Sequence, residues 1–187
     1  MDRRMIFQET KISGVNIVKT RSIRDNRGTF TRWFCGDDLS TFITGKNIVQ
    51  INHSCTHDAG VVRGLHFQNP PYAEMKLIRC IRGRVWDVVV DIRKNSPTYL
   101  QWYAEEISAD NMKMMVIPEG CAHGFQVLEP NSELLYLHTA FYTPKAENGL
   151  NPQDPYINIS WPLPIKDISD RDKSHPMISE TFQGVSL

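Results

Sequence analysis

Short apolar runs separated by turn residues recur along most of this chain, and their spacing is the feature that most constrains its fold. Turn signals such as Gly83, Asn95-Ser96-Pro97, Pro118-Glu119-Gly120 and Pro130-Asn131 interrupt the runs at intervals of about ten residues. The runs themselves fall at residues 48–53, 61–67, 76–82, 84–92, 101–107, 113–117, 122–128 and 133–142. Many short, evenly spaced strands are typical of sandwiches and barrels rather than of parallel βαβ units. We therefore predict an all-β fold, a double-stranded β-helix (cupin-like jelly roll) with short peripheral helices.

The remaining segments indicate one domain. A short helix is expected around residues 37–42, and a turn is expected after Ser108. Beyond Trp161-Pro162 the chain is rich in proline and polar residues, so we expect the tail, about residues 162–187, to wrap the surface without adding to a sheet. A chain of 187 residues with no internal repeat or linker has the size of one domain. We expect residues 1–187 to form it.

Charge and hydropathy exclude several classes of function. The chain has 21 basic and 21 acidic residues and no long basic run, which argues against nucleic-acid binding. No apolar stretch has the length of a membrane span or the pattern of a signal peptide, so we expect no membrane association. The four cysteines (Cys35, Cys55, Cys80 and Cys121) stand far apart. This spacing is typical of reduced cysteines, and we expect a cytoplasmic protein.

Several ionisable side chains lie in runs that should form the barrel interior. Five of them stand out: His66, Lys76, Asp87, His123 and Tyr136. Strand alternation places His66 on the same face as Gly64 and Val62. Each residue alone is explained as a satisfied core or rim residue. Together they would cost several kcal/mol unless all were paired or functional. As a set they indicate a site in the open mouth of the barrel.

These residue types suffice for epimerisation next to a ketone. An imidazole such as His66 can take a carbon-bound proton if a neighbouring group stabilises the resulting enolate. The ammonium group of Lys76 would provide that stabilisation. Tyr136, on the opposite face, would return a proton and so invert the carbon. A carboxylate bonded to the second imidazole nitrogen would fix the tautomer. This chemistry requires neither a metal nor an organic cofactor.

A metal site is the competing interpretation. The segment from Pro118 to His123 matches the P-x-G-x-x-H half of a metal-binding cupin. The other half requires H-x-H, whereas this chain has His66-Phe67-Gln68. With Gln68 in place of the second histidine, a three-histidine or histidine–carboxylate site is hard to assemble. We therefore predict no metal.

The longer motifs resemble the dTDP-4-dehydrorhamnose 3,5-epimerase family from about residue 6 to residue 177. The strongest are Arg63-Gly64-Leu65-His66-Phe67-Gln68 and Ala122-His123-Gly124-Phe125. The others are Asp25-Asn26-Arg27-Gly28-Thr29-Phe30, Gln50-Ile51-Asn52-His53-Ser54, Lys76-Leu77-Ile78-Arg79, Asp87 to Arg93, Ser96-Pro97-Thr98, Ser160-Trp161-Pro162 and Ser169-Asp170-Arg171-Asp172. The resemblance implies a cupin-like homodimer whose N-terminal strands, about residues 6–35, cross to the partner.

The same resemblance implies a role for each matching residue. His66 would be the base, paired with Asp172; Tyr136 would be the acid, and Lys76 would lie near the keto oxygen. The substrate, a nucleotide-diphospho-4-keto-6-deoxyhexose, would be bound by Arg27, Phe30, Arg32, Gln50, Asn52, Arg63, His123, Tyr142 and Glu147. No metal or cofactor is implied.

Departures from the family pattern leave alternatives open. Arg32 stands where the family usually has Glu, Leu137 and Leu100 replace a usual Lys and Gly, and residues 148–154 lack a usual Trp. Arg32 would suit the acceptors of cytosine, which points to a CDP-linked 4-keto-3,6-dideoxyhexose as in ascarylose-type pathways. The enzyme could then epimerise C5 or C3 alone. A non-catalytic sugar-nucleotide binding module is the alternative of another class.

Overall fold

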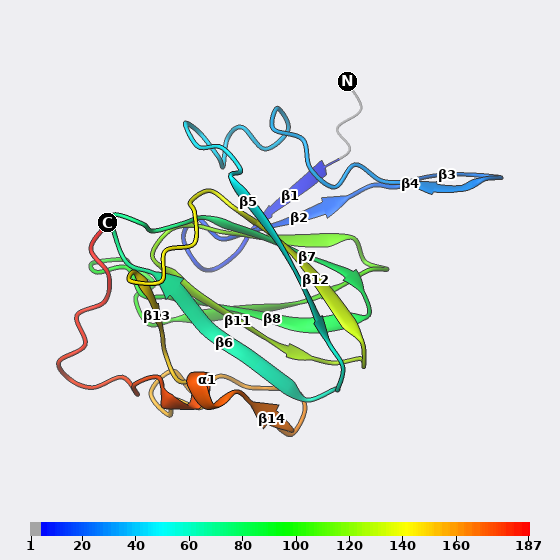
Figure 1. The fold of residues 1–187 in the computed structure, drawn as a ribbon. Coiled ribbons are helices and arrows are strands. Elements are labelled where there is room, and N and C mark those ends of the chain that lie inside the picture. Colours follow the sequence, from blue (N-terminus) through cyan, green and yellow to red (C-terminus); the bar gives the residue numbers. More distant parts are fainter. Residues whose placement is uncertain (1–4) are drawn as a thin grey trace.

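Two antiparallel sheets packed face to face form the body of the molecule in a computed structural model, which describes residues 5–187 (Figure 1). The first sheet has the order β1 (Met5–Glu9), β2 (Asn16–Thr20), β10 (Lys113–Ile117), β7 (Lys76–Arg82), β12 (Ser132–His138), β5 (Gln50–Thr56). The second has the order β13 (Glu147–Gly149), β6 (Val61–Gln68), β11 (Cys121–Val127), β8 (Arg84–Asp91), β9 (Trp102–Ser108). The predicted all-β jelly roll is therefore confirmed.

The central strands β7, β8, β10 and β11 are buried on both faces, because segments outside the two sheets cover their outer faces. On β10, Met115 and Ile117 point between the sheets, whereas Met114 and Val116 point to the outer side. The inner core also contains Ile78, Val89, Phe125 and Leu134 from the two facing sheets. Strands of this kind show weak alternation in sequence. Their inner positions are nevertheless well defined, and the ionisable residues of the mouth occupy such positions.

The segment after β4 (Gly28–Phe30) covers the outer face of the first sheet. Leu39 and Ile43 are buried there against Leu77 and Leu137. A helix was expected at residues 37–42, and this prediction is wrong: the segment forms consecutive turns, with hydrogen bonds such as Phe42 N to Leu39 O. The two apolar anchors hold it against the sheet, and its turns satisfy its backbone without a regular helix.

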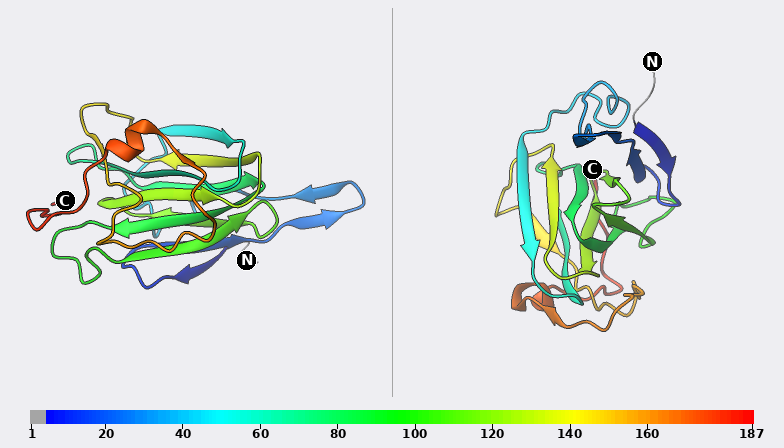
Figure 2. Two further views of the ribbon diagram at one scale, coloured as in Figure 1. Left: turned by 90° about the horizontal axis from the view of Figure 1, so that it is seen from below. Right: turned by 90° about the vertical axis from the view of Figure 1, so that its right-hand side faces the viewer.

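The C-terminal tail covers the second sheet and adds to it, contrary to the expectation that it would only wrap the surface. β14 (Asp167–Ile168) pairs in parallel with β6, and Val185 forms an isolated bridge with Arg93. The helix α1 (Asp170–Ser174) lies between them in sequence, beside β6 (Figures 1 and 2). It is only five residues long, and residues 5–187 include no helix long and apolar enough to cross a membrane.

A two-stranded hairpin projects away from the body of the molecule. It consists of β3 (Ile23–Asp25) and β4 (Gly28–Phe30), and the views in Figures 1 and 2 show it extending beyond the ends of both sheets. All six strand residues are exposed. Seven of the twelve large apolar side chains exposed in the described residues lie in the first part of the chain: Ile6, Ile23, Phe30, Trp33, Phe34, Val49 and Ile51. An apolar surface of this kind is typical of a contact with another chain.

A β-bulge in β6 turns two functional side chains toward the interior. Between β11 and β6 the register pairs His123 with His66 but Phe125 with Arg63, so β6 has one residue more than its partner. Simple alternation placed Val62 on the same face as His66. Because of the bulge, Arg63 takes the inward position opposite Phe125, and Val62, which pairs with Gln126, lies on the other face. The backbones approach closely at this bulge, where a Cβ on Gly64 would lie 2.5 Å from the Cα of Gly124.

We predict that Gly124→Ala destabilises the protein because its methyl group would meet the Arg63 carbonyl oxygen at 2.7 Å and Leu65 Cδ2 at 2.8 Å. Relief requires separation of β6 and β11, and we expect a loss of roughly 1–3 kcal/mol in the free energy of unfolding. Urea unfolding measures it. Gly36→Ala is the control, because its nearest neighbours are Phe34 ring atoms 4.0 Å away. Equal stability of the two variants would contradict the close approach.

Candidate active site

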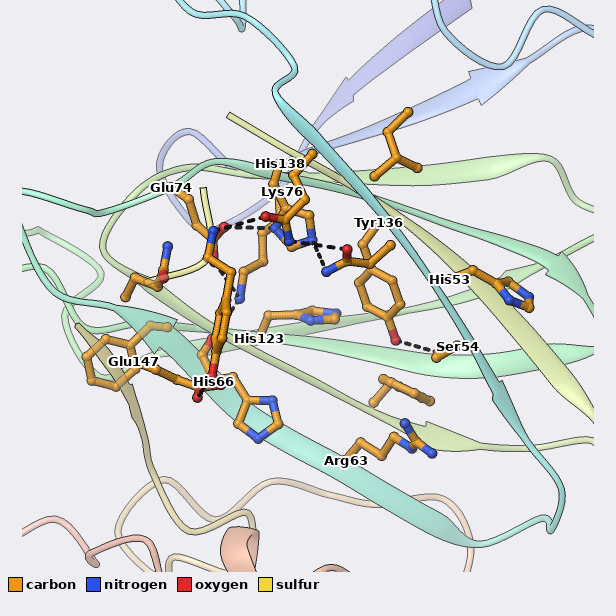
Figure 3. Close-up of a pocket in the computed structure, with 17 residues that line it drawn as sticks. His53, Ser54, Arg63, His66, Glu74, Lys76, His123, Tyr136, His138 and Glu147 are labelled. Carbon is orange, nitrogen blue, oxygen red and sulfur yellow. Dashed lines mark hydrogen bonds and ion pairs between the residues drawn. The ribbon is translucent and has the colours of Figure 1, made fainter. Parts of the chain in front are cut away.

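A cavity of about 570 Å³ opens between the two sheets and contains most of the residues singled out in the sequence (Figure 3). Its walls come from β5 and β12 on one sheet and from β6 and β11 on the other. Nine of the candidate residues line it: Gln50, Asn52, Arg63, His66, Lys76, His123, Tyr136, Tyr142 and Glu147. The size suits a small polar molecule with several functional groups.

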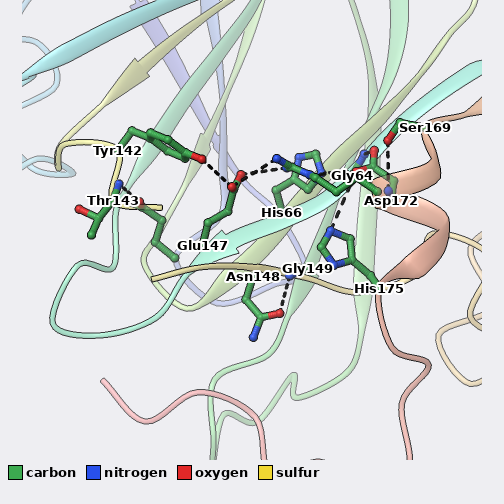
Figure 4. A network of polar contacts seen from close by, with 12 residues as sticks. Gly64, His66, Tyr142, Thr143, Glu147, Asn148, Gly149, Ser169, Asp172 and His175 are labelled. Carbon is green, nitrogen blue, oxygen red and sulfur yellow. Dashed lines mark hydrogen bonds and ion pairs between the residues drawn. The ribbon is translucent and has the colours of Figure 1, made fainter. Parts of the chain in front are cut away.

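His66 is held by a carboxylate that the tail brings from more than one hundred residues away. Its Nε2 lies 2.8 Å from Asp172 Oδ1, and the backbone N–H of Gly64 donates to Asp172 Oδ2 at 3.1 Å (Figure 4). The side chain of Ser169 caps the short helix through Asp172 N at 3.1 Å. Asp172 therefore fixes the imidazole and leaves Nδ1 as the nitrogen that can take a proton.

Asp172 is ionised in spite of its burial. Its side chain is 4 % exposed, and burial by itself would raise the pKa. The hydrogen bonds from His66 and Gly64 outweigh that effect, together with the charge of His66, and lower the pKa of Asp172 to about 2. The dyad thus combines a permanent carboxylate with an imidazole that is 28 % exposed toward the cavity.

Lys76 belongs to β7, on the sheet opposite that of His66, and its ammonium group is directed into the cavity. Its Nζ donates to the backbone oxygen of His66 at 3.2 Å and lies 3.4 Å from Glu74 Oε1. Its side chain is 10 % exposed. A buried ammonium this close to the His66 backbone is positioned to interact with a negative charge that forms beside the imidazole.

His123 forms a second imidazole–carboxylate pair at the back of the cavity. Its Nε2 lies 2.7 Å from Asp87 Oδ1, and the Asp87 side chain is completely buried. Burial raises the pKa of Asp87, whereas the charge and hydrogen bond of His123 act in the opposite direction. This pair explains how an aspartate is accommodated inside the valine-rich β8.

Tyr136 on β12 lines the same cavity as His66 but belongs to the other sheet. Its hydroxyl group is 2.9 Å from Ser54 Oγ on β5, and its ring stands at 76° to that of His123, with 6.2 Å between centroids. Burial raises the pKa of Tyr136 well above its usual value, and the Ser54 hydrogen bond opposes this only in part. The phenol is therefore protonated at neutral pH and can act as a proton donor.

The rim of the cavity is closed by a chain of polar contacts (Figure 4). Tyr142 donates its hydroxyl proton to Glu147 Oε2 at 2.7 Å and its backbone N–H to Gln50 Oε1 at 3.0 Å. Arg171 donates to Glu147 Oε1 at 2.9 Å from the helix that carries Asp172. Arg171 does not line the cavity itself and reaches its rim only through Glu147; in the sequence it stood out only as part of the Ser169–Asp172 motif.

Three candidate binding residues lie outside the cavity. Arg27 bonds the carboxylate of Asp25 within the hairpin turn at 2.6 Å and its side chain is 90 % exposed, and Phe30 is 64 % exposed. Arg32 lies 3.5 Å from Asp38 Oδ2. None of the three lines the cavity of its own chain.

Among the other lining residues, Ser54, Glu74 and His138 add polar groups that the sequence did not single out as site residues. The signal for His138 was available, because a residue two positions beyond Tyr136 faces the same side of a strand. Glu74 precedes β7, where alternation carries no information. Ser54 was part of a quoted motif, but its bond to Tyr136 depends on the pairing of β5 with β12.

The cupin-type metal set is engaged in other contacts. Gln68 accepts the N–H of Thr143 at 2.6 Å and donates to the backbone oxygen of Tyr72 at 3.0 Å, so its amide holds a loop. Within residues 5–187, one group places three possible metal-ligand atoms within 4.8 Å of one another: His66, Asp172 and His175. Two of its members form the dyad described above.

Known proteins resemble this chain over nearly its whole length. The family model described as dTDP-4-dehydrorhamnose 3,5-epimerase matches residues 9–180. A protein of that name from Sinorhizobium fredii is 38% identical over 187 residues, which cover 98% of this chain and 96% of the relative.

Two solved structures extend the likeness to the fold. The dTDP-4-dehydrorhamnose 3,5-epimerase of Bacillus anthracis, with TDP and pyrophosphate bound, has a TM-score of 0.89 and 36% identity, covering 93% of this chain and 99% of that one. The dTDP-6-deoxy-D-glucose-3,5-epimerase of Legionella pneumophila, in complex with dTDP-4-keto-L-rhamnose, has a TM-score of 0.87 and 34% identity, covering 92% of each chain.

We predict that Asp172→Asn removes an acid-dependent part of the stability. A depressed pKa stabilises the fold above the unfolded value of 3.8, and this contribution is lost as the pH falls through about 2. The wild type should therefore exceed the variant in unfolding free energy near pH 5, and that difference should shrink by about 2 kcal/mol toward pH 2. Urea unfolding across this range measures it. A difference independent of pH would show that Asp172 is not held ionised.

Proposed function

The chain belongs to the dTDP-4-dehydrorhamnose 3,5-epimerase family, and we propose that it inverts the carbons flanking the 4-keto group of dTDP-4-dehydro-6-deoxyglucose, with His66 as base and Tyr136 as acid. The protein is an isomerase that acts on a nucleotide sugar. The resemblance stated from the sequence motifs is thereby confirmed. Because the family consists of enzymes, the alternative of a non-catalytic binding module is disfavoured. Binding alone would not require a base and an acid.

The observation that carries the proposal is the position of His66 and Tyr136 on opposite sheets. His66 belongs to β6 and Tyr136 belongs to β12, and both line the same cavity. A sugar ring bound between the sheets would therefore present one face to the imidazole and the other to the phenol. Removal of a proton from one face of a carbon and delivery of a proton to the opposite face inverts the configuration of that carbon.

The proposed reaction moves two protons and forms no covalent bond to the protein. The imidazole Nδ1 of His66 takes the proton from the carbon next to the ketone, and the C–H electron pair becomes an enolate. Lys76 stabilises the negative oxygen through its ammonium group. Tyr136 then gives its hydroxyl proton to the opposite face of the same carbon, and the ketone forms again.

Asp172 supports the base, His66, and Ser54 supports the acid, Tyr136. The Asp172 carboxylate holds the Nε2 proton of His66 and stabilises the imidazolium that forms when Nδ1 is protonated. Ser54 lies 2.9 Å from the Tyr136 hydroxyl and belongs to the outermost strand of its sheet. It offers a route by which the phenolate recovers a proton from solvent.

A dTDP-linked substrate is better supported than a CDP-linked one. The relatives are named for dTDP substrates, and the Legionella structure contains a dTDP-linked keto sugar. The contrary argument depended on Arg32. Its guanidinium group lies near Asp38 and, like that of Arg27, outside the cavity of its own chain, so its position does not distinguish cytosine from thymine. The same relatives favour inversion of two carbons over one.

We also propose that the working form is a homodimer in which the hairpin of one chain completes the cavity of the other. Arg27 and Phe30 are exposed on the hairpin and lie outside the cavity of their own chain. Further exposed apolar side chains lie in the first part of the chain, among them Ile51 on β5, the outer strand that borders the cavity. A two-fold arrangement would cover these surfaces together.

We predict that the wild-type enzyme in D₂O incorporates deuterium at both C3 and C5 of dTDP-4-keto-6-deoxyglucose, as followed by proton NMR. His66→Asn should reduce exchange at both carbons by roughly 100-fold or more, because the base is lost. Tyr136→Phe should still exchange but invert slowly, because the proton returns to the face from which it left. Exchange by His66→Asn at the wild-type rate would refute the base assignment.

The CDP-linked 4-keto sugar, assayed for deuterium exchange under the same conditions, serves as the substrate control. Rapid exchange with that sugar alone would overturn the choice of nucleotide, and exchange at a single carbon would identify a mono-epimerase. His57→Gln is the matched histidine variant, because His57 is exposed and contacts Asn131 outside the cavity. It should behave as the wild type.

We predict that two inactive variants, His66→Asn and Arg27→Ala, restore activity when mixed. If Arg27 acts in the partner's cavity, each mixed dimer has one cavity with both wild-type residues, and random pairing restores about a quarter of the wild-type sites. Mixing after mild dissociation, followed by the exchange assay, measures this. No recovery, with dimers present by light scattering, would place Arg27 outside the partner's site.

A further inference from the structure

A third imidazole–carboxylate pair, His138 with Glu74, lies beside Lys76 on the cavity wall, and no step of the proposed reaction uses it (Figure 3). His138 Nδ1 is 2.8 Å from Glu74 Oε2, and the side chains are 9 % and 8 % exposed. His138 follows Tyr136 by two positions on β12, and the two rings are nearly parallel, with 6.3 Å between their centroids. The pair is thus built into the cavity wall and is not a surface contact.

Glu74 is shared between this imidazole and Lys76. Its second oxygen, Oε1, lies 3.4 Å from Lys76 Nζ. Burial opposes the ionisation of Glu74, but the His138 hydrogen bond and the charge of Lys76 outweigh it and hold the pKa of Glu74 below its usual value. A single buried carboxylate is therefore ionised between a lysine and a histidine.

This arrangement limits what Lys76 can do alone. With His138 neutral, the charges of Lys76 and Glu74 cancel, and an enolate oxygen beside them would gain little stabilisation. With His138 protonated, the three groups carry one net positive charge, which matches the single negative charge of the enolate. Because the side chains of Lys76, Glu74 and His138 are each no more than 10 % exposed, solvent screens their charges weakly, and this difference acts on the charge that develops in the transition state.

We propose that Glu74 and His138 are positioning residues for Lys76: the reacting complex carries His138 as an imidazolium, which binds the Glu74 carboxylate and leaves the charge of Lys76 to the keto oxygen. The inference rests on the proposed function, in which Lys76 stabilises the enolate. The inference implies that the reaction rate depends on the protonation of His138 as well as on that of the base, His66.

The neighbours of His138 indicate how proton uptake would follow substrate binding. Asn52 on β5 presents Nδ2 to His138 Nε2 at 3.4 Å, which suits a neutral imidazole that accepts there. An imidazolium requires an acceptor, which Asn52 supplies through Oδ1 if its amide turns. The ionisable groups that face His138 are Glu74 and Lys76 from the β7 side and Tyr136 on its own strand. An anionic substrate adds negative charge and favours the protonated form.

The test compares two single variants with their combination, by deuterium exchange into the dTDP-linked substrate between pH 5.5 and 9. In the wild type, kcat at saturating substrate should fall on the alkaline side, because the proposal requires an imidazolium at His138 in the bound complex and kcat reports the ionisations of that complex. His138→Gln leaves Glu74 to neutralise Lys76, so we expect a loss of roughly tenfold or more. Glu74→Gln should lose the alkaline fall. The double variant should recover most of the activity lost by His138→Gln, because Lys76 then has no carboxylate beside it.

Recovery in the double variant separates charge balance from a merely structural role, in which two cavity substitutions would do more damage than one. A double variant as slow as His138→Gln or slower, while still folded by circular dichroism, would overturn the inference. So would an unchanged alkaline fall in Glu74→Gln. The proposed function would still stand in either case, provided that the wild type exchanges and His66→Asn does not. Absence of exchange in the wild type would refute the proposed function itself.

Discussion

The close approach of β6 and β11 at Gly64 and Gly124 is the contact on which the site depends. Because neither residue has a side chain, the two backbones meet at a distance that any Cβ would prevent. The bulge at this point turns both Arg63 and His66 into the cavity. It also presents the N–H of Gly64 to Asp172. The close approach of the two backbones thus directs His66 into the cavity and holds the Asp172 carboxylate that orients its imidazole.

Pairing of charge is the second constraint on the interior. Four imidazoles line the cavity; that of His53 is largely exposed, and each of the other three has its own carboxylate: Asp172 for His66, Asp87 for His123 and Glu74 for His138. A buried ionisable group without a partner would destabilise the fold. The three pairs are nevertheless suited to different tasks. The imidazole of His66 is the most exposed of the three, which suits a group that exchanges protons with a substrate.

Ile51 on β5 is both exposed and part of the cavity wall, so the cavity reaches an outer strand of the single chain. The hairpin carries exposed aromatic and basic residues away from the body of the molecule, while β5 leaves one wall of the cavity at the outer edge of a sheet. A partner chain that covers this edge would also protect its unpaired backbone groups. In the proposed dimer, assembly and substrate binding therefore use the same surface, and loss of one would impair the other.

The sequence by itself determined the class of fold, most strand positions and the residue types of the site, because strand periodicity and turn residues are local properties. The runs at 76–82 and 113–117 match β7 and β10 in full. Motif resemblance also paired His66 with Asp172, which no local pattern could do.

Only the tertiary structure decided the rest. The bulge at Gly64 depends on the register between two strands, so alternation assigned Val62 to the wrong face. The turns at 37–42 and the short pairing of β14 depend on packing against sheets formed elsewhere in the chain. The partnership of Glu74 with both Lys76 and His138 joins strands far apart in sequence. Burial and the distance between charges are set by three-dimensional packing, and they decide which of these groups ionise.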